Sequence, residues 1–195
     1  MVLLLSSAFR LHAQVLDQSQ PVNTGLSAYA TMGWSGQSFT PSASTSVGAG
    51  FTVKNLGAVY NGTMSIGLWT GFPQTSTQLA QGTTPFTLAA GTTAMIDVFW
   101  SAVSVTPGTQ YFLTMNAGPF AQVFTTKAAN VYAGGVGYYD PSAVVTGTYS
   151  PVNGDLTFEE FSSSRVVATP EPSSATLVAL GLVGMVVALR RRVAA

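Results

Sequence analysis

Cysteine is absent from this chain of 195 residues, and the only histidine is His12. Without a thiol, the chain has no disulfide framework and no thiolate nucleophile or metal ligand. His12 lies in an expected leader segment, so the exported part also lacks the imidazole of Ser-His-Asp, Cys-His and common zinc sites. We therefore expect no metal site, no cofactor and no nucleophilic catalytic site.

Charged residues are scarce too. They make up 7% of the chain, and seven Lys and Arg balance seven Asp and Glu. A typical soluble domain carries about 25% charged residues. A nucleic-acid partner is excluded because no basic face can form, and a highly charged disordered chain is equally disfavoured. Hydrophobic residues at 47%, with 20 Gly and 10 Pro, dominate instead.

The first 13 residues form a short apolar run that ends in the small residue Ala13, before Gln14. This arrangement is similar to the back half of a secretory signal. We expect residues 1–13 to be a signal segment with cleavage after Ala13. The alternative is an N-terminal strand or helical turn.

A second apolar run lies near the other end of the chain. Residues 173–189 carry no charge, and Arg190, Arg191 and Arg192 follow directly. Seventeen residues of helix reach about 26 Å, the lower limit for crossing a bilayer. Because basic residues stay in the cytoplasm, the preceding chain is expected outside. The sequence thus predicts a C-terminal transmembrane helix over residues 173–189, with the arginines as the cytoplasmic stop.

The predicted helix is directly preceded by the triplet Pro170, Glu171 and Pro172. The triplet, the short apolar helix and the terminal arginines resemble the bacterial PEP-CTERM sorting signal, here over residues 166–195. The resemblance implies recognition of the triplet by an exosortase, a membrane enzyme that resembles a cysteine transpeptidase, cleaves near the motif and either releases or re-anchors the ectodomain. It also implies a bacterium that makes exopolysaccharide and biofilm.

Residues 14–165 show the alternation typical of β-strands. Apolar and other residues alternate with period two over residues 64–69, 95–100, 111–116 and 155–159. No convincing amphipathic helix and no fixed-period repeat are present. We predict an all-β ectodomain: a single antiparallel β-sandwich, jelly-roll-like, of about 150 residues. Motifs such as Ile66-Gly67-Leu68-Trp69 are similar to surface β-sandwich modules found upstream of this sorting signal.

Turn signals separate the predicted strands. Asn61-Gly62 lies between two apolar runs and predicts a tight hairpin turn. Pro107-Gly108 suits a type II turn, and Ala90-Gly91 and Gly134-Gly135 mark further breaks.

Carboxylates are the remaining catalytic candidates, and glycoside hydrolysis needs two of them about 5–9.5 Å apart. Glu159 and Glu160 are strand neighbours that face opposite ways, and we interpret them as a solvated strand edge. Asp155 and Glu159 would lie about 13 Å apart. A cross-strand partner such as Asp97 or Asp140 is the open alternative. Asp140 could also supply a calcium ligand, although an Asp that caps a turn before Pro141 is the simpler interpretation.

Aromatic side chains are the candidates for binding. Trp34, Tyr138 and Tyr139 lie in predicted loops, and Trp69 lies out of phase with Met64, Ile66 and Leu68. These four could stack on the apolar faces of sugar rings. The alternative for each is a loop plug or a second core face. Trp100, in phase with its neighbours, is assigned to the core.

The sequence therefore predicts a non-enzymatic, exported surface or extracellular-matrix protein, anchored in the membrane and processed by an exosortase-type enzyme. The alternative is a carbohydrate-binding module associated with exopolysaccharide or biofilm. A secreted hydrolase with a carboxylate pair is the third hypothesis.

Overall fold

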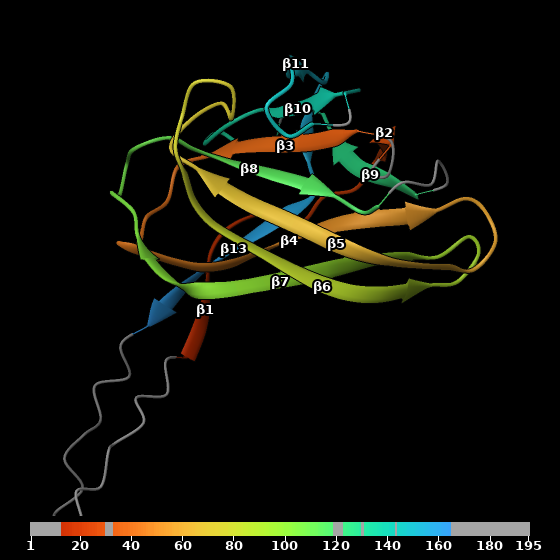
Figure 1. The fold of residues 1–195 in the computed structure, drawn as a ribbon, viewed down its shortest axis with the longest axis horizontal. Helices are drawn as coiled ribbons and strands as arrows, with labels where there is room; N and C mark the ends of the chain where they lie inside the picture. The colour runs from red at the N-terminus through yellow and green to blue at the C-terminus, as the bar shows by residue number, and fades with distance from the viewer. Residues whose placement is uncertain (1–12, 30–32, 119–122, 130, 143, 165–195) are drawn as a thin grey trace, which may run out of the picture. The chain divides into compact units, whose positions relative to one another are not determined.

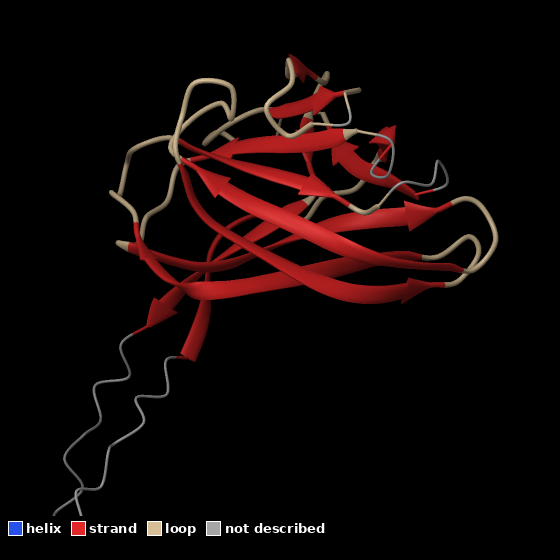
Figure 2. Cartoon of the chain, viewed as in Figure 1, coloured by secondary structure: helices blue, strands red, loops and turns tan. Residues whose placement is uncertain are grey.

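The regular elements of the protein are β-strands throughout the part described by the structure, a computed structural model that covers residues 13–29, 33–118, 123–129, 131–142 and 144–164. Figure 2 shows these strands in red, joined by short loops. They are β1 (Ala13–Gln20), β2 (Gly25–Tyr29), β3 (Trp34–Phe39), β4 (Thr45–Asn55), β5 (Tyr60–Trp69), β6 (Gln78–Leu88), β7 (Thr93–Ser104), β8 (Tyr111–Asn116), β9 (Val123–Ala128), β10 (Gly137–Asp140), β11 (Ser150–Pro151), β12 (Asp155–Leu156) and β13 (Phe158–Ser164).

The strands form two antiparallel sheets (Figure 1). Sheet A has the order β1-β13-β4-β9-β12, with β7 paired to β4 and β2 paired to β9. Sheet B has the order β11-β10-β3-β8-β5-β6. The prediction of an all-β domain with antiparallel sheets is confirmed.

The core lies between the two sheets and follows the predicted alternation. Met64, Ile66 and Leu68 of β5 are fully buried, as are Leu113 and Met115 of β8. Sheet A supplies the opposing side chains, which include Ala49, Phe51, Val53 and Phe158. Trp100 packs against this cluster, as the sequence predicts. Because successive side chains of a strand alternate between faces, the intervening residues lie on the outer surfaces of the sandwich.

Two predicted turns are confirmed and one prediction is wrong. Gly91 and Gly108 adopt φ values of 72° and 76°, which glycine adopts without strain. Asn61-Gly62, however, lies inside β5, where Gly62 pairs with Phe86 of β6. Glycine is needed there for packing, because a Cβ on Gly62 would lie 2.3 Å from Cε1 of the Tyr60 ring.

The interpretation of Glu159 and Glu160 as a solvated strand edge is also wrong. β13 lies between β1 and β4 and pairs with both, so neither side of β13 is a sheet edge. Glu160 is fully buried and Glu159 is half-buried. Strand β1 covers the side of β13 that would otherwise be an edge, and local alternation in β13 carries no information about that partner.

Residues 12–164 form one compact unit. Over the described ranges, no helix has the length and apolar character needed to cross a membrane. The predicted helix 173–189, the sorting motif and most of the predicted signal segment lie outside the described residues. Ala13, the predicted cleavage position, begins β1 and pairs with Ser164.

Candidate functional site

Three of the four predicted glycan-binding residues gather on the outer face of sheet B. Trp69 of β5 lies opposite Phe112 of β8, and the Phe112 ring passes over Gly36 of β3. Tyr138 of β10 pairs with Gly36 on its other side. A Cβ on Gly36 would lie 2.4 Å from Cζ of Phe112, so glycine allows the two aromatic side chains to approach across β3.

Two loops complete this assembly. Phe72, from the loop between β5 and β6, lies 4.9 Å from the Phe112 ring and 5.0 Å from the Tyr138 ring, centroid to centroid. Tyr149, from the loop after β10, meets Phe112 edge-on at 5.2 Å. Gln74 and Gly147 join the two loops by a hydrogen bond from the Gln74 amide to the Gly147 carbonyl. We call this assembly the aromatic cluster; its members are Trp34, Trp69, Phe72, Phe112, Tyr138 and Tyr149.

The aromatic cluster has a buried base and an accessible rim. Trp69, Phe112 and Tyr149 are 6%, 2% and 8% exposed, whereas Phe72 is 40% exposed and Trp34 and Tyr138 are half-buried. The Trp69 indole N–H donates to the Thr114 hydroxyl at 3.0 Å. Trp69 therefore belongs to a second core face, and any ligand contact would fall on the rim.

Tyr139 does not join the aromatic cluster. It lies on the opposite face of β10 from Tyr138, and its hydroxyl oxygen would lie 3.0 Å from a Cβ placed on Gly33. The prediction grouped Tyr138 and Tyr139 because both were assigned to a loop. The structure places them on a strand, which separates them.

Asp140, beside the aromatic cluster, caps a turn. Its carboxylate accepts hydrogen bonds from the backbone N–H and from the hydroxyl of Ser142, both at 2.8 Å. The interpretation of Asp140 as a turn cap is confirmed. Burial raises the pKa of the Tyr149 hydroxyl, and the Asp140 carboxylate raises it further. The Tyr149 hydroxyl is buried without a hydrogen-bond partner.

The outer face of sheet A brings two carboxylates into one row. Asp97 of β7 and Glu159 of β13 both pair with Gly50 of β4, from opposite sides. Burial raises the pKa of both side chains, and Asp97 raises that of Glu159 further. Asp155 is not available for such a pair, because it is fully buried and accepts the Tyr132 N–H at 2.9 Å. Within the described ranges, no group of three or more Asp, Glu, His or Cys could hold a metal ion.

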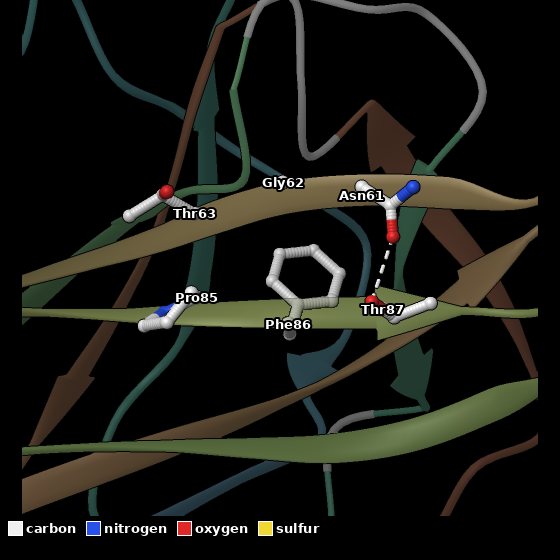
Figure 3. A pocket seen from close by; sticks show the side chains of 6 residues that line it. All are labelled: Asn61, Gly62, Thr63, Pro85, Phe86 and Thr87. Atoms are coloured by element: carbon white, nitrogen blue, oxygen red, sulfur yellow. Dashed lines mark hydrogen bonds between the residues drawn. The ribbon is translucent and has the colours of Figure 1, made fainter.

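A shallow hollow of about 440 Å³ lies over the ends of β5 and β6. Figure 3 shows the Phe86 ring between the two strands, with the Asn61 amide oxygen accepting a hydrogen bond from the Thr87 hydroxyl at 2.7 Å. Gly62, Thr63 and Pro85 complete the lining. Since none of these side chains titrates or binds metals readily, the hollow offers no catalytic chemistry.

Phe72, Phe112 and Tyr149 are members of the aromatic cluster that sequence reasoning missed. Phe112 carried a readable signal, because it alternates out of phase with the core residues Tyr111 and Leu113, as Trp69 does in β5. Two out-of-phase aromatic residues on separate strands indicate a second buried face. Phe72 and Tyr149 come from loops, for which no periodicity exists.

Comparison with known families identifies one segment. The family model of the PEP-CTERM protein-sorting motif matches residues 168–192. No curated protein matches the chain. The motif indicates an exported protein that is targeted to an exosortase and associates with the membrane. The predicted recognition triplet, Pro170 to Pro172, and the terminal arginines all fall inside the matched range.

Proposed function

We propose that the protein is a non-enzymatic surface or extracellular-matrix protein, whose β-sandwich is delivered outside the cell and released from its C-terminal helix by an exosortase. The observation that carries this proposal is the sorting motif at residues 168–192, preceded by a folded all-β unit. Catalysis is disfavoured by the composition, since the described residues contain no His and no Cys. A jelly-roll-like sandwich fits this role as a stable displayed module.

In this proposal each part of the C-terminal signal has one task. Pro170, Glu171 and Pro172 are recognised by the exosortase, residues 173–189 cross the bilayer, and Arg190, Arg191 and Arg192 remain in the cytoplasm. A signal segment over residues 1–13 starts export, with cleavage after Ala13.

The proposal is tested by replacing the triplet in the native host. We expect the variant Pro170→Ala, Glu171→Ala, Pro172→Ala to accumulate uncleaved in the membrane fraction, whereas the wild-type sandwich reaches the surface or medium. The control Ser173→Ala, Ser174→Ala alters the adjacent residues and should be processed normally. Normal processing of the triplet variant would contradict the assigned role.

A second function, binding of carbohydrate from exopolysaccharide or biofilm, is favoured by the aromatic cluster. Its rim presents Phe72, Trp34 and Tyr138, and flat aromatic faces can pack against the apolar faces of sugar rings. We expect Phe72→Ala and Trp34→Ala to weaken retention on host exopolysaccharide. Phe99→Ala is the matched control, because Phe99 is 43% exposed on the outer face of the other sheet. Equal retention of all variants would remove this function.

A further inference from the structure

Charged side chains are divided unequally between the two sheets. The strands of sheet B contain one charged residue, Asp140, which is 2% exposed and caps a turn. The other charged residues of the described ranges lie on strands of sheet A: Asp17, Lys54, Asp97, Lys127, Asp155, Glu159 and Glu160. The strands of sheet B therefore present an outer face without an accessible charge.

A strip of polar, uncharged side chains follows β5 and β6 on this face. The core residues of β5 occupy even-numbered positions, so its odd-numbered positions lie on the outer face. Their partners on β6 share that face and are exposed. The strip carries amides and hydroxyls, with one proline among them, and we call it the polar lane; its members are Asn61, Thr63 and Ser65 of β5, and Gln78, Gln81, Thr83, Pro85 and Thr87 of β6.

Side chains of the polar lane bond to one another and keep capacity for a ligand. The Gln81 amide donates to the Ser65 hydroxyl at 3.1 Å and accepts the Gln78 amide at 3.0 Å. The Thr87 hydroxyl donates to the Asn61 amide oxygen at 2.7 Å (Figure 3). Each amide has a second N–H, and each hydroxyl oxygen has a further lone pair. The polar lane thus offers donors and acceptors side by side, which the hydroxyls of a sugar match because they both donate and accept.

The polar lane connects the shallow hollow at one end to the aromatic cluster at the other. The hollow includes Asn61, whereas Trp69 follows at the far end of β5. The Trp69 indole lies over Gly67, where a Cβ would be 2.9 Å from Nε1 of Trp69 and 3.1 Å from Nε2 of Gln78. Eight residues separate Asn61 from Trp69, about 27 Å in an extended strand. This length accommodates several sugar rings in a row.

We propose that the polar lane and the aromatic cluster together bind one extended strand of a neutral polysaccharide, laid along β5 with one end at the Phe72 rim. This inference rests on the carbohydrate-binding function proposed above and names its ligand class. A neutral chain exchanges hydrogen bonds to water for hydrogen bonds to the polar lane. A polymer of uronic acids would lose hydration of its carboxylates against strands that offer no cation in return.

The ligand class is tested by isothermal titration calorimetry on the purified full chain in detergent. The neutral probes are a soluble β-glucan, a galactomannan and an arabinogalactan, and the acidic probes are alginate and polygalacturonate. We expect at least one neutral polymer to bind, and the acidic polymers to bind at least about tenfold more weakly. Oligosaccharides of the tightest neutral polymer should bind more tightly as they lengthen from disaccharide to hexasaccharide, because longer chains occupy more of the polar lane.

The polar lane itself is tested by Gln81→Ala, which removes an exposed amide from its middle. Loss of one or two hydrogen bonds should weaken binding of the tightest neutral polymer about three- to tenfold. The matched control is Gln14→Ala, which removes an exposed amide from β1 of sheet A and should leave binding unchanged. Thermal unfolding of both variants checks that each is folded.

The possible outcomes separate this inference from the function on which it rests. Absence of binding to every polymer would overturn both. Binding that Phe72→Ala weakens but Gln81→Ala does not, or that is no tighter for a hexasaccharide than for a disaccharide, would overturn the polar lane and leave the aromatic cluster as the binding site. Acidic polymers that bind as tightly as neutral ones would overturn the assigned ligand class.

Discussion

The aromatic cluster should depend on Phe112, and the substitution Phe112→Ala measures that dependence. Phe112 is 2% exposed, and its ring meets those of Phe72, Tyr149 and Tyr138 at centroid distances of 4.9, 5.2 and 5.4 Å. Truncating a buried phenylalanine to alanine costs about 3–5 kcal/mol. For a domain near 150 residues, a loss of 1 kcal/mol lowers Tm by about 2–4 °C, so we expect Tm to fall by about 6–20 °C.

The assay is urea unfolding followed by tryptophan fluorescence, with a thermal scan in parallel. Trp34 and Trp69 pack in the same cluster, so their emission should change already in the folded variant. The control Phe72→Ala removes a ring that is 40% exposed and should cost about 1–2 kcal/mol. A loss below 1 kcal/mol for Phe112→Ala, or equal losses for the two variants, would refute the assignment of Phe112 to a second core face.

Three further substitutions, one of them with a matched control, test local features. Gly36→Ala should destabilise by about 1–3 kcal/mol in urea unfolding, because its Cβ would lie 2.4 Å from Cζ of Phe112; Gly25→Ala, with nothing within 4 Å, should be near neutral. Gly108→Ala should cost about 1 kcal/mol from its φ of 76° alone, since no atom lies within 4 Å of its Cβ. Burial raises the pKa of the Asp97 carboxyl in the folded protein. The contribution of Asp97 to stability is therefore largest below its unfolded pKa and falls as pH rises through its folded pKa. The variant Asp97→Asn should flatten the curve of stability against pH above about pH 4, and an unchanged curve would contradict this assignment.

Alternation along single strands was enough to predict the fold class and much of the core. In β5, the sequence places Trp69 out of phase with Met64, Ile66 and Leu68. This difference assigned the inner and outer faces of the strand correctly. The same reasoning failed at Asn61-Gly62, because a dipeptide that favours a turn also suits a strand position where a neighbouring ring leaves no room for a side chain.

Pairing between distant strands was the information that the sequence did not carry. The burial of Glu160 follows from β1, whose residue Gln18 pairs with it from 142 positions earlier in the chain. The aromatic cluster likewise joins Phe72 to Tyr149 through Phe112, three residues from separate parts of the chain. Sequence reasoning found Trp34, Trp69 and Tyr138 one by one, and only the sheet register shows that they share a face.

The most direct test of the proposed sorting is the intact mass of the protein recovered from the cell surface or medium of its native host. The full chain has a mass of 20.2 kDa. We expect a mature species that begins near Gln14 and ends close to Pro172, without the apolar run or the arginines. Recovery of the uncut chain as a dissolved cytoplasmic protein would contradict both export and exosortase processing.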